Sequence, residues 1–185
     1  MTIAAVLLAA GGGTRFTGPT HKLLADFRGK PVVQWAVENA AAAELDDLVV
    51  VTGAVDVRHV LPAGVTVLDN PQWQQGQATS LQAAVRHAWR AGYDAIVVGL
   101  GDQPLVPAAT WQTIAHSGGP LVSAVMDGRR SPPMRIDKEL WPLLPTAGDE
   151  GARALIRGRP DLLREIACPG HGLDIDTLED LPSWS

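Results

Sequence analysis

The sequence predicts an α/β fold, a single doubly wound and mainly parallel sheet flanked by helices. Strand-like and helix-like segments alternate from one end of the chain to the other. Uninterrupted apolar runs at residues 3–9, 48–51 and 95–100 are typical of strands buried on both faces. With 185 residues, 46% of them hydrophobic and 19% charged, the chain has the length and composition of one globular domain, so we assign residues 1–185 to one domain.

Helix-start and turn residues between the apolar runs indicate where the other elements lie. The expected order is strand 3–9, helix 31–44, strands 48–51 and 65–68, helix 79–91, strand 95–100, helix 107–115, strand 121–125, helix 149–156, strand 164–168, a turn over 172–177 and a short final helix. Pro31 suits a first helical turn, while Thr79 or Ser80, and later Asp149, are expected helix caps. Pro132 and Pro133 predict a loop inside the domain.

Composition excludes several classes of protein. No apolar run approaches the roughly 20 residues of a membrane span, and the first apolar stretch lacks a basic leader, so we interpret it as a strand rather than a signal peptide. Cys168 is the single cysteine, which favours a reducing cytoplasm and a small buried residue over a nucleophile. A net charge of −5 argues against a nucleic-acid partner, so anionic ligands need a local basic site.

The first strand ends in a glycine-rich turn followed by positive charge. Gly11, Gly12 and Gly13 leave backbone N–H groups open to a ligand, and Arg15 and Lys22 bring cations to the same mouth. The pattern lacks the Gly-Lys-Ser/Thr of a P-loop and the last glycine of the dinucleotide fingerprint. A nucleotide's phosphates fit this turn, although the glycines alone would equally serve a plain tight turn.

Carboxylates follow two later segments. Asp102 comes directly after strand 95–100, where the carboxyl ends of parallel strands share one crevice, and it suits either Mg²⁺ or a turn before Pro104. Asp174 and Asp176 alternate about Ile175, so an extended backbone puts both on one face. They could share a cation, or they could face solvent with Asp176 or Thr177 capping the last helix.

Two polar loops complete the pattern. Residues 70–81 run from Asn70-Pro71 through Trp73 into a helix, so amides such as Gln77 could read a base edge, and Ser80 lies at a helix start. Trp73 could stack on a ring, but a loop aromatic more often packs on the core. Arg153, one turn into the helix after residues 148–151, could face a substrate phosphate or water. The five histidines show no metal-ligand spacing.

These motifs together resemble the MobA-like nucleotidyltransferase domain, in the order of that superfamily and over nearly the whole chain. The Leu-Ala-Ala-Gly opening, the Asn-Pro-x-Trp loop and Gly-Asp-Glu-Gly-Ala-Arg at residues 148–153 are closest to the molybdenum cofactor cytidylyltransferases. The resemblance implies a Rossmann-like fold and a nucleotide site formed by Leu8, Ala9, Ala10, Gly11, Gly12, Gly13, Thr14, Arg15, Lys22, Gln77, Ser80 and Asp102.

The resemblance also implies roles within that site. Arg15 and Lys22 would contact phosphates, and Asp102 with one of Asp174 and Asp176 would hold Mg²⁺, or Mn²⁺ in its place. Arg15, Lys22 and Asp102 are the expected catalytic residues. Arg135 and Arg153 are expected on the acceptor side, where this chain departs from the family: Arg130-Ser131-Pro132 replaces Gly-His-Pro, and Arg135 replaces an aromatic residue. The stretch from Arg15 to Lys22 is also one residue longer than usual.

The expected reaction is transfer of CMP from CTP to the phosphate of molybdenum-bearing molybdopterin, with release of pyrophosphate. Ala10 stands where guanylyl-transferring relatives carry glycine, and this favours CTP. A sugar phosphate or another phosphorylated metabolite is the alternative acceptor, and a nucleotide- or cofactor-delivery protein without turnover is the alternative outside enzymes. A transient contact with an apo-molybdoenzyme is a possible partnership. The sequence does not predict an oligomeric state.

Overall fold

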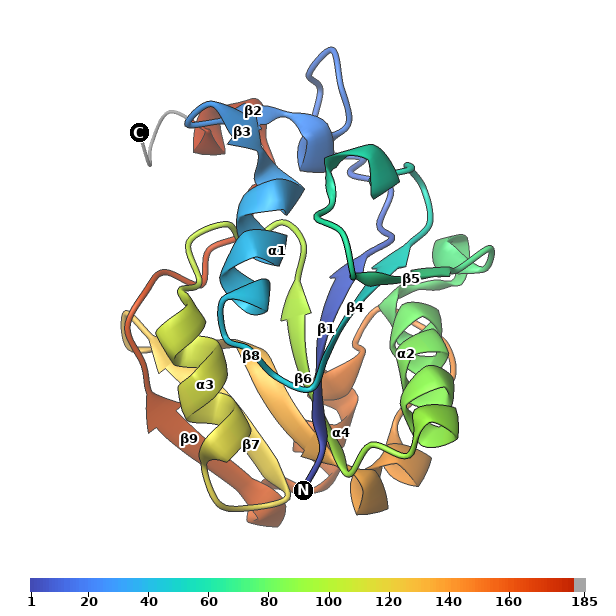
Figure 1. Cartoon of the computed structure of the whole chain (residues 1–185), viewed down its shortest axis with the longest axis vertical. Helices are drawn as coiled ribbons and strands as arrows, with labels where there is room; N and C mark the ends of the chain where they lie inside the picture. The colour runs from blue at the N-terminus through green and yellow to red at the C-terminus, as the bar shows by residue number, and fades with distance from the viewer. Residues whose placement is uncertain (182–185) are drawn as a thin grey trace.

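The computed structural model describes residues 1–181 as one twisted sheet with helices on both faces (Figure 1). Within that range the strands lie side by side in the order β5 (Thr66–Asp69), β4 (Asp47–Thr52), β1 (Ile3–Ala9), β6 (Ala95–Leu100), β8 (Arg129–Asp137), β7 (Leu121–Met126) and β9 (Leu163–Ala167). Neighbours pair in parallel except at β8, which runs against both β6 and β7. The expected mainly parallel, doubly wound fold is confirmed.

β1 lies inside the sheet because every one of its residues is apolar and buried. Its register pairs Leu8 with Val51 of β4 and with Leu100 of β6, so these strands finish at the same edge. In Figure 1 this edge is at the top, below the hairpin formed by β2 (Asp26–Phe27) and β3 (Lys30–Pro31). The segments that follow β1 and β6 therefore meet there.

Helices cover the two faces with separate apolar clusters. Residues of α1 (Val32–Ala41) and α3 (Ala108–His116) pack on one face, and residues of α2 (Gln77–Ala91) and α4 (Ala152–Gly158) pack on the other. Figure 1 shows α1 and α3 in front of the sheet and α4 behind it. No helix in the described range has the length and hydropathy needed to cross a membrane.

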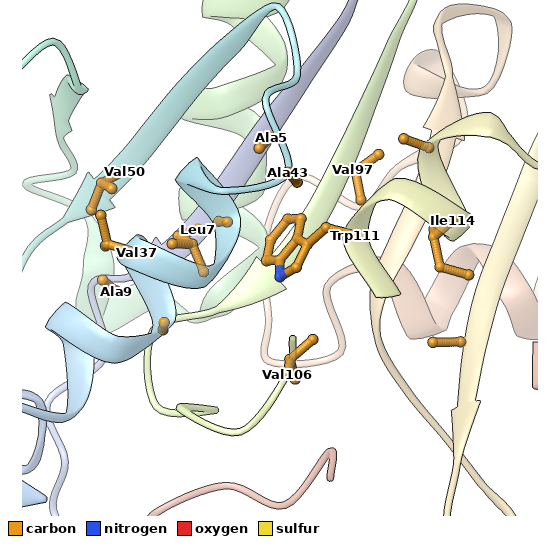
Figure 2. Packing of buried hydrophobic residues seen from close by; sticks show 14 of the residues in the cluster. Ala5, Leu7, Ala9, Val37, Ala43, Val50, Val97, Val106, Trp111 and Ile114 are labelled. Carbon is orange, nitrogen blue, oxygen red and sulfur yellow. The ribbon is translucent and has the colours of Figure 1, made fainter. Parts of the chain in front are cut away.

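Trp111 of α3 fills the first cluster opposite a glycine of β6. The indole is 2% exposed and lies near Leu7, Val97 and Val106 (Figure 2). A Cβ placed on Gly99 would lie 2.5 Å from the indole ring, closer than packed atoms approach. The missing side chain at Gly99 therefore leaves the space that the Trp111 ring fills against β6.

The loop expected at Pro132-Pro133 is wrong, because both prolines lie within β8. The pairing of β8 with β7 jumps from Met134–Ser123 to Ser131–Ala124, so the prolines form an irregularity where no ladder bond is needed. Proline has no N–H to donate, and such a bulge is where a sheet tolerates it. The Pro132–Pro133 peptide bond is cis.

Two expected helix caps are also wrong. α2 begins at Gln77 after Gly76, with no side-chain cap, while Thr79 lies inside the helix and donates its hydroxyl to the Gly76 carbonyl at 2.9 Å. α4 begins at Ala152 after Gly151, not at Asp149, and runs to Gly158. Both glycines have positive φ, which allows sharper entry into the helix than Ser, Thr or Asp would permit. α1 ends at Ala41, three residues before the expected end.

We predict that Gly99→Ala lowers the free energy of unfolding by about 1–3 kcal/mol, because the added methyl group overlaps the Trp111 ring. Urea denaturation followed by circular dichroism measures the change. Gly158→Ala is the matched control: its Cβ would meet no atom within 4 Å, and α4 should keep or gain stability. Equal losses in the two variants would contradict the packing role of Gly99.

Candidate functional site

A cavity of about 540 Å³ opens at the carboxyl ends of β1 and β6, and we refer to it as the main cavity. All twelve expected nucleotide-binding residues line it: Leu8, Ala9, Ala10, Gly11, Gly12, Gly13, Thr14, Arg15, Lys22, Gln77, Ser80 and Asp102. Six further residues complete the wall: Leu23, Trp73, Gln74, Gly76, Leu100 and Asp149. The structure thus gathers the expected set in one place, and nucleotide binding by it stays a prediction.

The glycine turn is held from below by His21. The imidazole accepts a hydrogen bond from the Leu23 N–H at Nδ1 (3.3 Å), so Nε2 carries the proton and donates to the Gly11 carbonyl at 3.0 Å. Burial lowers the pKa of His21 and keeps the ring neutral. This histidine fixes the turn as a hydrogen-bonding group and not as a metal ligand.

Trp73 packs on the glycine turn, and its stacking on a ligand ring stays a prediction. Its indole lies against the turn, since a Cβ on Gly12 would be 2.9 Å from the ring, and it also lines the main cavity. The Ala10 methyl group packs toward Gly53, beside the Trp73 Cβ. Ala10 is only 4% exposed, so it shapes the cavity through the position of the turn and of Trp73.

The cations and carboxylates at the cavity floor are paired. The Lys22 ammonium donates to Asp102 Oδ2 at 2.6 Å and to Asp176 Oδ1 at 2.9 Å, and these three side chains are 12%, 16% and 22% exposed. The exposed Arg15 reaches the other Asp176 oxygen at 2.9 Å. Burial would lower the pKa of Lys22, but the charge and hydrogen bond of Asp102, reinforced by Asp176, outweigh burial and raise the pKa.

Asp174 lies beside this cluster in a less favourable environment. Burial, followed by the negative charge of Asp102, raises its pKa to about 6, although Gln103 Nε2 donates to it at 2.8 Å. The same amide nitrogen contacts Ser131 Oγ at 3.2 Å and the Gly172 carbonyl at 2.8 Å. Gln103 therefore fastens the segment that carries Asp174 to the end of β6 and to β8.

The structure offers two carboxylates as possible protein ligands for Mg²⁺ or Mn²⁺. Among residues 1–181 no three His, Cys, Asp or Glu side chains form a ready metal site. Asp102 and Asp176 nevertheless converge on one cation, and Asp102 Oδ1 is buried without a hydrogen-bond partner. Mg²⁺ is commonly held by one or two carboxylates with water and substrate phosphates, so these two residues are sufficient protein ligands.

A backbone hydrogen bond and a buried asparagine hold the polar loops at the main cavity. The Ala78 N–H donates to the Gly148 carbonyl at 2.9 Å, and a Cβ on Gly76 would lie 2.4 Å from that same carbonyl. Buried Asn70 donates to Thr79 and Ser80 hydroxyls, at 2.9 Å each, and so fixes the start of α2. Gln77 and Ser80 consequently face the main cavity.

Arg153 lines a smaller, mostly apolar cavity of about 80 Å³ that shares Leu8, Gln77 and Leu100 with the main cavity. We refer to it as the side cavity; Arg130 also lies in its wall. The expected place of Arg153 next to the nucleotide site therefore agrees with the geometry, and its contact with an acceptor stays a prediction.

Arg135 does not belong to either cavity, so its expected place on the acceptor side is wrong. It is 6% exposed, and its guanidinium donates to Asp137 at 2.7 Å and to the carbonyls of Ala115 and Ser117 at 3.0 and 2.8 Å. Strand alternation in β8 points it toward the carboxyl end of α3, where unpaired carbonyls favour a cation.

Three residues of the site region escaped the sequence analysis: His21, Gln103 and Asp149. His21 and Gln103 are adjacent to Lys22 and Asp102, so position next to a motif was the available signal. Asp149 faces the main cavity instead of capping a helix. Cys168 carries no further role: burial raises the pKa of its thiol, which keeps it protonated near neutral pH.

A glycine turn, cations and carboxylates at the carboxyl edge of a doubly wound sheet define an α/β nucleotide-binding enzyme. The family model of the MobA-like NTP transferase domain matches residues 5–165, and the chain belongs to this family. It is accordingly a nucleotidyltransferase-type enzyme by family.

Individual relatives agree with this assignment and widen it. A nucleotidyl transferase from Methanothermobacter has a TM-score of 0.84 at 26% identity, over 99% of this chain and 95% of that one. Rv0371c of Mycobacterium tuberculosis has a TM-score of 0.83 at 27% identity, over 100% and 97%, and it is also known as a manganese complex. Nicotine blue oxidoreductase of Paenarthrobacter nicotinovorans is 31% identical over 97% of this chain and 94% of its own length.

A cytidylyltransferase relative matches over a shorter range. The 3-deoxy-manno-octulosonate cytidylyltransferase of Vibrio cholerae is 34% identical over 63% of this chain, which covers 46% of that protein.

We predict that Asp174→Asn stabilises the protein at pH 8 in EDTA by about 1–2 kcal/mol, after allowing for solvent screening. A carboxyl whose pKa rises from 3.8 to about 6 on folding binds more protons when folded, so stability falls as pH rises between these values. The asparagine removes this cost. Thermal unfolding at pH 8 and pH 3.5 tests it: the gain should vanish at pH 3.5, and an equal gain at both would contradict the assignment.

Proposed function

We propose that the protein transfers CMP from CTP to the terminal phosphate of molybdenum-bearing molybdopterin and releases pyrophosphate. The observation that carries the proposal is the main cavity, where the glycine turn, Arg15 and Lys22 line the same space as Asp102, while Asp176 forms ion pairs with both cations. A triphosphate needs N–H donors and cations, and the transfer needs a place for a divalent metal. This cavity offers both.

The reaction requires little covalent chemistry from the protein. An oxygen of the acceptor phosphate attacks the α-phosphorus in line, one P–O bond forms, and the bond to pyrophosphate breaks. The turn over Gly11, Gly12 and Gly13 positions the triphosphate, and Arg15 and Lys22 offset the charge on its outer phosphates. Asp102 and Asp176 would hold Mg²⁺, which when bound neutralises charge on the reacting phosphates. A phosphate monoester is largely ionised near neutral pH, so no general base is assigned.

Three features support CTP as the donor. The motifs at residues 8–15, 70–73 and 148–153 are closest to the cytidylyl-transferring branch of the family. Ala10 in the turn packs beside Gly53 and Trp73, so its methyl group sets the position of the turn and of Trp73 in a way that would favour a pyrimidine. A relative that is named a cytidylyltransferase is 34% identical to this chain over 63% of this chain's length.

The side cavity supports an acceptor next to the nucleotide. It adjoins the main cavity through Leu8, Gln77 and Leu100, its wall is mostly apolar, and Arg130 and Arg153 lie at it. An acceptor with an anionic end, such as a pterin phosphate, would bring its phosphate near Arg130 and Arg153. A sugar phosphate is the second candidate acceptor; the substrate in the name of the Vibrio relative is a sugar acid.

Two other functions remain as outcomes of the assay. Nicotine blue oxidoreductase is similar over nearly its full length, so a redox activity is one of them. Delivery of a bound nucleotide or cofactor to an apo-molybdoenzyme without turnover is the other. Pyrophosphate release by purified protein, measured with the four NTPs and a panel of phosphorylated acceptors, supports nucleotidyl transfer. Reduction of nicotine blue without pyrophosphate release would overturn it.

We predict that Asp102→Asn lowers turnover by at least about 100-fold, because a neutral amide cannot balance the metal and phosphate charges. Pyrophosphate release measures the effect, with circular dichroism to confirm folding. The exposed Asp161, which pairs with Arg159 at 2.7 Å, gives the control variant Asp161→Asn with unchanged turnover. Turnover within threefold of wild type in a folded Asp102→Asn protein would remove this carboxylate from the proposal.

We predict a kcat/KM for CTP above that for GTP by about 10–200-fold, the range that one small steric difference supplies. Both donors are compared with the same acceptor. Ala10→Gly should shrink this ratio by loosening the turn, while leaving the CTP value within a few fold. A preference of the wild-type protein for GTP or ATP would refute the cytidylyl assignment and leave nucleotidyl transfer intact.

A further inference from the structure

We propose that Lys22 is the resident cation of the metal site in the nucleotide-free protein, so that a divalent metal enters only when Lys22 leaves. The inference rests on the proposed function in taking Asp102 and Asp176 as metal ligands. It adds a mechanism of regulation: the protein excludes free metal until a triphosphate draws the lysine away.

The position of the ammonium shows why Lys22 and a metal would compete for one place. Lys22 Nζ lies 2.6 Å from Asp102 Oδ2 and 2.9 Å from Asp176 Oδ1, so it occupies the point on which both carboxylates converge. Oxygen ligands bind Mg²⁺ at about 2.1 Å. A metal bound by these two oxygens would therefore lie within a few ångström of the ammonium, where two cations cannot be stable together.

A carboxylate oxygen without a hydrogen-bond partner indicates that the site can accept a further ligand. Asp102 Oδ1 is buried and has no hydrogen-bond partner, while its neighbour Oδ2 carries the contact with Lys22. A buried carboxylate oxygen without a partner is costly. A divalent ion accepts more oxygen ligands than an ammonium, so once Lys22 has left it could also use this second oxygen of Asp102.

The path of the Lys22 side chain shows how the ammonium could move from the carboxylates to the phosphates. A Cβ on Gly13 would lie 3.1 Å from Lys22 Cγ, so the stem runs along the glycine turn. Rotation about the flexible stem moves the ammonium from the carboxylates toward the turn, where the phosphates are proposed to bind. One lysine can then serve the carboxylates in one state and the triphosphate in the other.

The consequence is reciprocal coupling between metal and nucleotide. A triphosphate that attracts Lys22 frees both carboxylates and strengthens metal binding, and a bound metal strengthens nucleotide binding by the same factor. The nucleotide-free protein should hold metal weakly even though its carboxylates already face each other.

Mn²⁺ binding to the full-length, nucleotide-free protein tests the inference, with free Mn²⁺ followed by electron paramagnetic resonance. We expect Lys22→Met to tighten Mn²⁺ binding by at least about tenfold over wild type. Arg15→Gln is the matched control, because Arg15 also contacts Asp176 but is exposed and does not bridge the carboxylates; it should change affinity by less than about threefold. Equal tightening in the two variants, or none in Lys22→Met, would overturn the proposal.

Two further measurements keep the result decisive. Lys22→Gln replaces Lys22→Met if the latter does not fold, and the double variant Lys22→Met/Asp102→Asn should lose the gain, which locates the ion at Asp102. If the double variant bound Mn²⁺ as tightly as Lys22→Met does, the ion would lie elsewhere and the proposal would be refuted. These measurements use Mn²⁺ alone, so they stand or fall independently of whether pyrophosphate release is observed.

Discussion

The contact of one ammonium with two carboxylates joins three distant parts of the chain. Lys22 follows the glycine turn, Asp102 follows β6, and Asp176 lies near the end of the described chain, 80 and 154 residues from the lysine. None of the three charges could be buried alone at this cost, and each is tolerated because the others are present. The geometry of the main cavity depends on this arrangement.

Several neutral contacts hold the same region in place. His21 secures the Gly11 carbonyl, Gln103 fastens the segment of Asp174 to the end of β6, and the Ile175 N–H donates to the Asp102 carbonyl at 2.9 Å. Ile175 itself is 1% exposed beneath the β2–β3 hairpin. The segment that carries Asp174 and Asp176 is therefore positioned by packing and backbone hydrogen bonds, in addition to the ion pairs of Asp176 with Lys22 and Arg15.

Two groups in the charged cluster lower the stability of the folded protein. Asp174 with its raised pKa, and the partnerless Asp102 oxygen, both reduce the stability of the folded protein. Such groups cluster where a fold binds charged substrates. The chain is similar both to transferases and to an oxidoreductase, so the fold by itself does not determine which reaction it supports.

The sequence by itself determined the strands and the glycine turn. Residues 3–9 and 95–100 are short runs that are apolar throughout, which favours buried strands over helices, so β1 and β6 were predicted with their boundaries. Because parallel strands end at one edge, the position of Asp102 beside the turn followed as well. β8 was missed because its two prolines indicate a loop, and only the irregular pairing with β7 shows how the strand accommodates them.

Only the tertiary structure decided which charges meet. Arg135 and Arg153 look alike along the sequence, yet strand alternation turns Arg135 toward the carbonyls of α3, while α4 leaves Arg153 beside the side cavity. In the same way, no local signal places Lys22 between Asp102 and Asp176. Sequence patterns report the environment of neighbouring residues, whereas an ion pair depends on distances across the fold, which exist only after the sheet has formed.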